Sequence, residues 1–236
     1  MNSAEFVKPY PNQERAIRAV AHRDWLCDPE SGVRLPALRS ATARELVFEH
    51  IGSRYPTADN LDVLARALGR LHAAAYTRHL HAARLDEPFP TRHGLIISDF
   101  VTPRRTALET MPLPVTGQPA ALYKDANIRN FLLTDDGVAI VDFDDLTLAP
   151  FGYDLAKLVV SAAMTHGRLD PHAIELALET YNAHIAPAGR NTTCSLPNLK
   201  VYAEFHHLLT ARYLHRNGYR HPWPEVRPWA EPEVAQ

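Results

Sequence analysis

The sequence predicts an α+β protein in two parts, a small strand-rich part over residues 1–52 and a larger helical part over residues 53–236. Three observations support this division. Short runs rich in Val, Phe and Ile lie in the first part, and long runs with leucine at helical intervals lie in the second. The turn-forming stretch SRYPTADN separates them. With 236 residues, of which 46% are hydrophobic, the chain has enough apolar material to bury a core.

The first part is predicted to contain three strands and one helix. EFVKPY, residues 5–10, is a short strand that ends at prolines. A helix follows over residues 12–26, with Asn12 as its N-cap. Two further strands are predicted over residues 33–40 and 45–52, and the second of them is rich in Val, Phe and Ile.

The second part is predicted to be mainly helical. Leucines recur on one face of residues 61–85, which indicates a long helix. A later helix over residues 170–185 has Asp170 at its N-cap and Pro171 in its first turn. The other predicted elements are a strand over 93–101, a proline-spotted connection over 102–119, helices over 154–164 and 199–217, and an irregular proline-broken tail.

Composition and charge exclude several classes of function. The formal net charge of −2 gives no basic field that would favour nucleic acid or a membrane surface as partner. Cys27 and Cys194 form no C-x-x-C pair, which fits a reducing compartment. The first ten residues lack the basic start and apolar run of a signal peptide, and no apolar stretch is long enough to span a bilayer. We therefore expect a cytoplasmic protein.

Residues 123–145, YKDANIRNFLLTDDGVAIVDFDD, gather acidic side chains around two short apolar runs. The runs flank TDDG, which is a hairpin signal. A hairpin of this length returns the chain beside its own start, so Asp142 is expected near the loop that carries Asp125 and Asn130. Two carboxylates and an amide at one point suit Mg²⁺, and one carboxylate can instead accept a proton from a hydroxyl group.

The same spacing matches the template for phosphoryl transfer, and it carries a family resemblance. YKDANIRN and IVDFDD resemble the H-x-D-x-x-x-x-N and V-D-F motifs of the aminoglycoside phosphotransferase and choline kinase group, relatives of the protein kinases. The resemblance implies that Asp125 is the catalytic base and that Asn130 and Asp142 hold Mg²⁺, with ATP as co-substrate. Tyr123 stands where the family has His, a departure that concerns the packing of the loop.

Motifs on both sides extend the resemblance. FGYDLAKL is similar to the family segment in which an aspartate, here Asp154, braces the catalytic loop; capping of the helix that follows is the alternative role. ALGRLHA resembles the L-x-x-L-H-A helix of the family. RELVFEHIG resembles the last strand of the small lobe and its hinge, which implies that backbone groups of Glu49, His50 and Ile51 hold adenine.

Charged residues on either side of these motifs have candidate roles as well, and those of Lys8 and Glu14 come from the resemblance. FVKPY falls where the family has its phosphate-binding lysine, so Lys8 is expected to contact phosphate and to pair with Glu14; a surface ion pair is the alternative. Asp144 is favoured as a further metal ligand over a solvated loop charge. Lys124 and Arg129 either meet phosphate or are exposed loop charges.

One part of the template is absent from this sequence. The template places a glycine-rich hairpin ahead of the lysine strand. Only seven residues precede Lys8, and no two glycines in the chain are separated by a single residue. The resemblance thus implies a two-lobed, protein-kinase-like fold with a reduced N-terminal lobe.

The function implied is transfer of the γ-phosphoryl group of Mg-ATP, or of another nucleotide, to a hydroxyl group of a small molecule. Residues 210–229 carry four arginines against one glutamate, in the region that lines the acceptor pocket in this fold family. Such a surface favours a neutral or anionic acceptor over a polycation.

Two alternatives to the kinase function come from other functional classes. A pseudokinase-like binding module would keep the fold without efficient transfer, and the absent glycine-rich hairpin favours it. A haloacid-dehalogenase-type phosphatase would use AIVDFDDLTL as a D-x-D-x-T nucleophile motif, but Leu146 occupies the Thr position.

Overall fold

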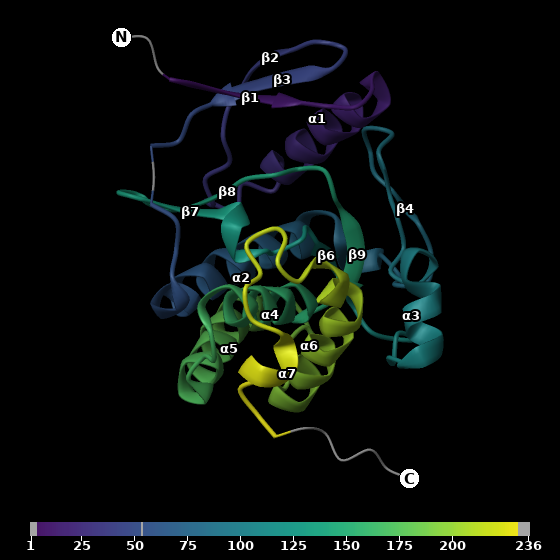
Figure 1. Cartoon of the computed structure of the whole chain (residues 1–236). Helices are drawn as coiled ribbons and strands as arrows, with labels where there is room; N and C mark the ends of the chain where they lie inside the picture. The colour runs from purple at the N-terminus through teal and green to yellow at the C-terminus, as the bar shows by residue number, and fades with distance from the viewer. Residues whose placement is uncertain (1–3, 53, 231–236) are drawn as a thin grey trace.

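The computed structural model describes residues 4–52 and 54–230, and it has the two parts that the sequence predicts (Figure 1). The smaller part is a three-stranded antiparallel sheet in the order β1-β3-β2, with one helix, α1. Its elements are β1 (Glu5–Pro9), α1 (Gln13–Cys27), β2 (Leu38–Ala41) and β3 (Glu45–Glu49). The side chain of Asn12 accepts a hydrogen bond from the Arg15 amide at 2.9 Å, which confirms the predicted N-cap.

The larger part is a packed group of helices. They are α2 (Leu61–Arg78), α4 (Tyr153–His166), α5 (Pro171–Ile185), α6 (Leu196–Thr210) and the short α7 (Trp223–Val226). Helix α2 packs along α5, and α4 packs against α6. Gly69 permits the first of these contacts, because a Cβ atom there would lie 2.9 Å from the carbonyl oxygen of Tyr181. No helix in the described ranges is long and apolar enough to cross a membrane.

Three two-stranded antiparallel pairs lie beside these helices. The pairs are β4 (Phe89–Pro90) with β5 (Ile96–Ile97), β6 (Ala120–Tyr123) with β9 (Thr147–Pro150), and β7 (Phe131–Thr134) with β8 (Gly137–Ile140). The β7–β8 hairpin was predicted. The β6–β9 pair and helix α3 (Arg105–Thr110) were not, since the sequence around them is rich in proline.

Several boundaries differ from the predicted ones. The strand predicted over residues 33–40 begins only at Leu38, after Pro36, which has no N–H to donate to a ladder. The helix predicted over 61–85 ends at Arg78 and continues as a 3₁₀ turn over Leu80–Ala82. The strand predicted over 93–101 is reduced to β5.

The described part of the C-terminal tail packs against α6 rather than fraying. Trp223 is fully buried, and its indole N–H donates to Glu204 at 3.1 Å. The indole of Trp229 donates to the same carboxylate at 3.2 Å, and Arg227 donates to it at 3.0 Å. Hydrogen bonds to the half-buried Glu204 therefore hold residues 223–229 against the helical part.

Candidate active site

The predicted catalytic loop connects β6 to β7, and the hairpin that follows returns to it. The Nδ2 group of Asn130 donates to the backbone oxygen of Asp125 at 2.9 Å. The amide of Val141 donates to the Asn130 carbonyl at 2.9 Å. These two bonds bring the residue before Asp142 beside the loop, so the three residues that the spacing singled out lie together.

Asp125 and Asp142 both adopt a left-handed backbone. Their φ angles are 56° and 69°, a region that non-glycine residues rarely occupy and in which Asp and Asn are enriched. Such conformations cost about 1–3 kcal/mol each and are concentrated at active sites. The surrounding hydrogen bonds hold both aspartates in this geometry.

Asp154 supports the catalytic loop through hydrogen bonds to its backbone. Its fully buried carboxylate accepts the Ala126 amide at 2.8 Å and the Lys124 amide at 3.0 Å. It does not cap α4, because the helix begins at Tyr153 with Gly152 in the N-cap position. His72, the histidine of the LHA motif on α2, lies 3.6 Å from this carboxylate and is itself buried.

Replacement of Asp154 by alanine is expected to destabilise the protein by about 3 kcal/mol, because it leaves two buried loop amides without an acceptor. Urea unfolding of the wild type and the variant measures this difference. Asp170→Ala is the matched control: Asp170 is an exposed N-cap of α5, whose loss costs about 1 kcal/mol. Equal destabilisation by the two substitutions would contradict the bracing role.

Lys8 reaches from β1 to the end of the hairpin. Its ammonium lies 2.8 Å from Asp142 Oδ1 and 2.8 Å from Asp144 Oδ1, and the Tyr10 hydroxyl donates to Asp144 at 2.9 Å. Burial disfavours the ammonium, but the two carboxylates outweigh it and raise the pKa of Lys8 above its usual value. Burial likewise opposes ionisation of Asp142, and the ammonium of Lys8 outweighs it, so the pKa of Asp142 is lowered.

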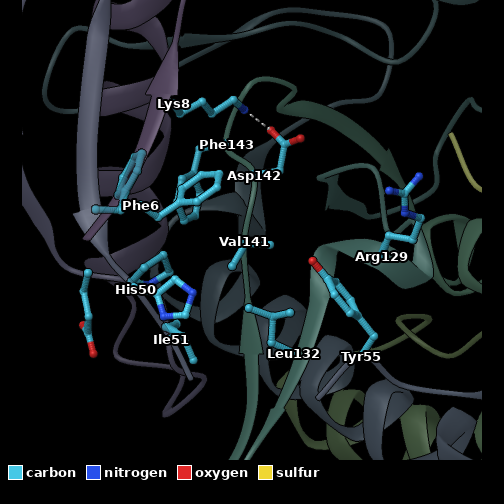
Figure 2. Close-up of a pocket in the computed structure, with 13 residues that line it drawn as sticks. Phe6, Lys8, His50, Ile51, Tyr55, Arg129, Leu132, Val141, Asp142 and Phe143 are labelled. Atoms are coloured by element: carbon cyan, nitrogen blue, oxygen red, sulfur yellow. Dashed lines mark hydrogen bonds and ion pairs between the residues drawn. The ribbon is translucent and has the colours of Figure 1, made fainter. Parts of the chain in front are cut away.

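The expected Lys8–Glu14 ion pair is not formed. Glu14 instead accepts a hydrogen bond from Arg18 at 2.7 Å, one turn further along the exposed face of α1. The reason is that residues four apart on a helix are neighbours, whereas Lys8 reaches toward Asp142 at the end of the hairpin (Figure 2). The prediction for Glu14 as partner of Lys8 was wrong.

The carboxylates of Asp142 and Asp144 fit a divalent cation. They already converge on one positive group, the Lys8 ammonium. Within the described ranges, no three His, Cys, Asp or Glu side chains form a ready-made metal cluster. Two converging carboxylates are what Mg²⁺ usually takes from a protein, because it completes its shell with water and phosphate oxygens.

A pocket of about 170 Å³ opens between the small sheet and the hairpin, next to Asp142 (Figure 2). Glu49, His50 and Ile51 line it, as the resemblance implied for an adenine site. The His50 amide already donates to the Ala4 carbonyl at 3.0 Å, while the Ile51 amide has no backbone acceptor in the described chain. The other lining residues are Phe6, Lys8, Pro36, Phe48, Tyr55, Arg129, Leu132, Val141, Asp142 and Phe143.

The two basic residues of the catalytic loop have different positions. Lys124 is buried, and its ammonium donates to the Val141 carbonyl at 2.6 Å, so it is not an exposed loop charge. Burial lowers its pKa. Arg129 is exposed and lines the pocket.

Tyr123 fits the place of the family histidine. Its hydroxyl donates to Asp125 Oδ1 at 3.0 Å. The guanidinium of Arg104 lies 5.0 Å from the centre of its ring, and the ring of His206 stacks on it with centroids 5.8 Å apart. The substitution therefore leaves the loop packed and gives Asp125 a hydrogen-bond donor.

Sequence reasoning missed Lys157, whose ammonium lies 3.4 Å from Asp125. A signal was present: DLAKLVV places one lysine in an otherwise apolar helical run. A lysine in a buried helix needs a polar or charged partner, so this pattern points to a nearby carboxylate.

Solved structures of several kinases share this fold. An amicoumacin kinase in complex with AMP-PNP, Ca²⁺ and Ami is 16% identical with a TM-score of 0.57, over 90% of this chain and 75% of that one. The macrolide 2'-phosphotransferase MphH from Brachybacterium faecium is 15% identical with a TM-score of 0.56, over 97% and 86%. The choline kinase LicA from Streptococcus pneumoniae is 18% identical with a TM-score of 0.57, over 88% and 75%. The architecture is thus the protein-kinase-like one that the sequence predicted.

Sequence comparison adds the family. No curated protein shows a significant match to the chain. The profile of the phosphotransferase enzyme family matches residues 48–189, a span that begins in β3 and includes the catalytic loop, the hairpin and Asp154. The chain belongs to the phosphotransferase enzyme family.

Proposed function

We propose that the protein is a small-molecule kinase that transfers the γ-phosphoryl group of Mg-ATP to a hydroxyl group. The observation that carries this proposal is that the hydrogen bonds of Asn130 hold Asp125 beside the end of the hairpin, where Asp142 lines a pocket together with the hinge residues. A base, candidate metal ligands and a nucleotide-binding pocket are the parts that phosphoryl transfer requires.

In this proposal Asp125 is the catalytic base. It orients the acceptor hydroxyl and receives its proton while the acceptor oxygen bonds to the γ-phosphorus. The bond from that phosphorus to the bridging β-γ oxygen breaks, and ADP leaves with the electron pair. Positioning supplies most of the rate, because phosphoryl transfer needs little covalent chemistry from the protein.

Asn130, Asp142 and Asp144 are the proposed Mg²⁺ ligands. The ion would neutralise charge on the β- and γ-phosphates. Because Lys8 now contacts both Asp142 and Asp144, it would have to turn from them when Mg-nucleotide arrives. From that position its ammonium can face the phosphates, in keeping with the role that the resemblance gives it.

Adenine is proposed to lie in the pocket against the hinge. Glu49, His50 and Ile51 line the pocket, the Ile51 amide has no backbone acceptor in the described chain, and Phe48 and Phe143 offer apolar contact. The amicoumacin kinase structure contains AMP-PNP and Ca²⁺, which supports an ATP-like nucleotide and a divalent cation for this fold.

ATP consumption with Mg²⁺ across a panel of small hydroxyl compounds tests the proposal. The expected result is ADP formation that depends on Mg²⁺ and on at least one acceptor. Tight nucleotide binding without turnover for any acceptor would favour the pseudokinase-like alternative. The phosphatase alternative is contradicted by the family match.

The acceptor is predicted to be neutral or anionic. Arg212, Arg216 and Arg220 are exposed on the segment between α6 and α7. Tyr219 of this segment contacts Asn127 of the catalytic loop, so the positive charge of the segment disfavours a polycationic acceptor. Arg227, which the sequence grouped with them, instead lies against Glu204 and is buried. Assays with a polycationic aminoglycoside and a neutral hexose, each at low and moderate salt, check this prediction. Productive phosphorylation of the polycation that weakens as salt rises would show an acidic pocket and contradict it.

A further inference from the structure

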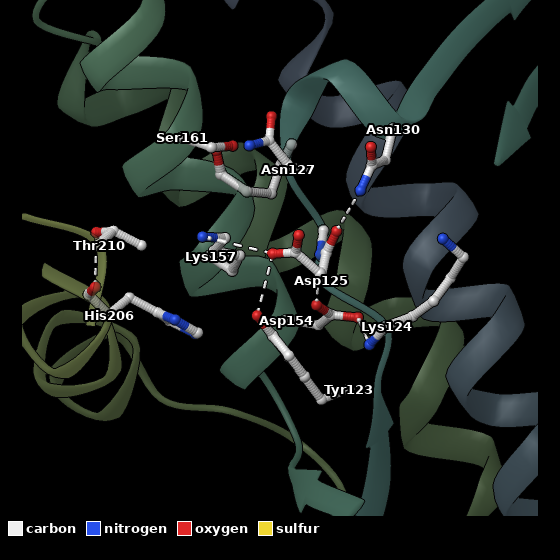
Figure 3. Close-up of polar contacts among 12 residues, drawn as sticks. Tyr123, Lys124, Asp125, Asn127, Asn130, Asp154, Lys157, Ser161, His206 and Thr210 are labelled. Carbon is white, nitrogen blue, oxygen red and sulfur yellow. Dashed lines mark hydrogen bonds and ion pairs between the residues drawn. The ribbon is translucent and has the colours of Figure 1, made fainter. Parts of the chain in front are cut away.

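Two side chains converge on the same oxygen of the proposed base (Figure 3). The ammonium of Lys157, on α4, lies 3.4 Å from Asp125 Oδ1, and the hydroxyl of Tyr123 donates to Oδ1 at 3.0 Å. No hydrogen bond or ion pair engages Oδ2 within the described parts of the chain. The carboxylate is thus held on one side and open on the other.

The charge of Lys157 is stabilised by two partners, Asp125 and Tyr219. Helix α4 is buried on every side from Tyr153 to Met164, and only 7% of the lysine side chain is exposed. Burial disfavours the ammonium, yet Asp125 and the Tyr219 hydroxyl outweigh it, and the pKa of Lys157 is raised. A buried cation of this kind is retained only with well-placed partners.

We propose that Lys157 is a positioning residue for phosphoryl transfer: together with Tyr123 it fixes Oδ1 of Asp125, so that Oδ2 faces the acceptor hydroxyl and receives its proton. This inference rests on the proposed function, in which Asp125 is the base. Lys157 keeps its own proton throughout, and the acceptor proton passes to Oδ2 as the new oxygen–phosphorus bond forms.

The lysine is itself held by the segment between α6 and α7. The Tyr219 hydroxyl lies 3.2 Å from the Lys157 ammonium and accepts a hydrogen bond from Asn127 of the catalytic loop at 3.1 Å. The backbone of Tyr219 bonds to His215 and Arg216 at 2.9 Å and 3.0 Å. The chain from Tyr219 through Lys157 to Asp125 therefore links this segment to the orientation of the base.

The test compares Lys157→Met with the wild type in Mg-ATP hydrolysis, where water is the acceptor. Methionine keeps the length of the side chain and removes its charge. We expect kcat to fall about 100-fold, the loss that follows from a misplacement of about 1 Å. The KM for ATP and the melting temperature should stay near the wild-type values, since Lys157 does not line the nucleotide pocket.

Further variants separate positioning from folding. Tyr219→Phe removes the hydroxyl that contacts both Lys157 and Asn127 but keeps the Lys157 charge, so kcat should fall in the same direction but by less. Tyr123→Phe should also lower kcat, and Tyr123→His should restore it because imidazole can donate to Oδ1. Lys200→Met is the matched control: Lys200 lies on α6 with its ammonium over the Trp229 ring, and its loss should leave kcat unchanged.

The outcomes distinguish this inference from the proposed function. A wild type that hydrolyses no ATP and phosphorylates no acceptor overturns the proposed function and this inference with it. An active wild type with an undiminished Lys157→Met variant overturns the positioning role alone. A crystal structure of Lys157→Met gives a readout apart from activity: a carboxylate of Asp125 that has rotated supports the role, and an unchanged one contradicts it.

Discussion

Asp125→Asn is expected to lower turnover by at least 100-fold while nucleotide affinity and the melting temperature change little. Positioned proton transfer contributes about 10²–10⁴-fold, and an amide cannot accept the acceptor proton. Asparagine has the size of aspartate and tolerates the left-handed backbone at this position, where φ is 56°. Its amide oxygen can still receive the Tyr123 hydroxyl. Steady-state kinetics with thermal unfolding on the same preparations measure both quantities.

The matched control is Asp135→Asn, which makes the same chemical change at an exposed residue in the turn between β7 and β8. It should leave turnover unchanged. Full activity in Asp125→Asn would contradict the assignment of Asp125 as the catalytic base. A variant that loses activity and melts far below the wild type would instead point to a structural role for Asp125.

Asp142→Asn is expected to abolish Mg²⁺-dependent nucleotide binding. The substitution removes the charge of one of the two carboxylates near the proposed metal position, and Mg²⁺ prefers charged oxygen ligands. Asparagine is chosen over alanine because φ at this residue is 69°, where alanine would add strain. Isothermal titration calorimetry of Mg-AMP-PNP, with EDTA in a parallel series, measures the loss.

Two comparisons sharpen this experiment. Affinity for AMP-PNP without metal should change little, because the hinge residues are untouched. Asp144→Asn should weaken Mg-AMP-PNP binding as well if Asp144 is a ligand, and should have no effect if it only anchors Lys8 and Tyr10. Unchanged Mg-nucleotide affinity in Asp142→Asn would count against the proposed metal position.

The sequence predicted those parts of the fold that depend on neighbouring residues. The Asn12 cap, the hairpin over β7 and β8 and the Asp170 cap of α5 each follow from a few consecutive residues. The proximity of Asp125, Asn130 and Asp142 could be predicted for the same reason, since one hairpin connects them.

Contacts between distant residues were harder to foresee. Lys8 was paired with Glu14 from the resemblance, but its partners are Asp142 and Asp144, more than 130 residues away. The β6–β9 pair joins two runs of four residues, one of which ends in proline, and neither alone indicates a strand. Tyr219 reaches Lys157 only because the segment after α6 folds back, a path that no local pattern encodes.

The left-handed backbone at Asp125 and Asp142 also bears on how this chain can evolve. At such angles aspartate, asparagine and glycine are tolerated far better than other residues, so the fold itself restricts the exchange of either position. Asparagine is the nearest of these in shape, and a single base change converts an aspartate codon into an asparagine codon. A phosphotransferase and a folded relative that has lost its chemistry therefore stand one mutation apart. Loss of catalysis should accordingly arise in this lineage more readily than loss of the structure.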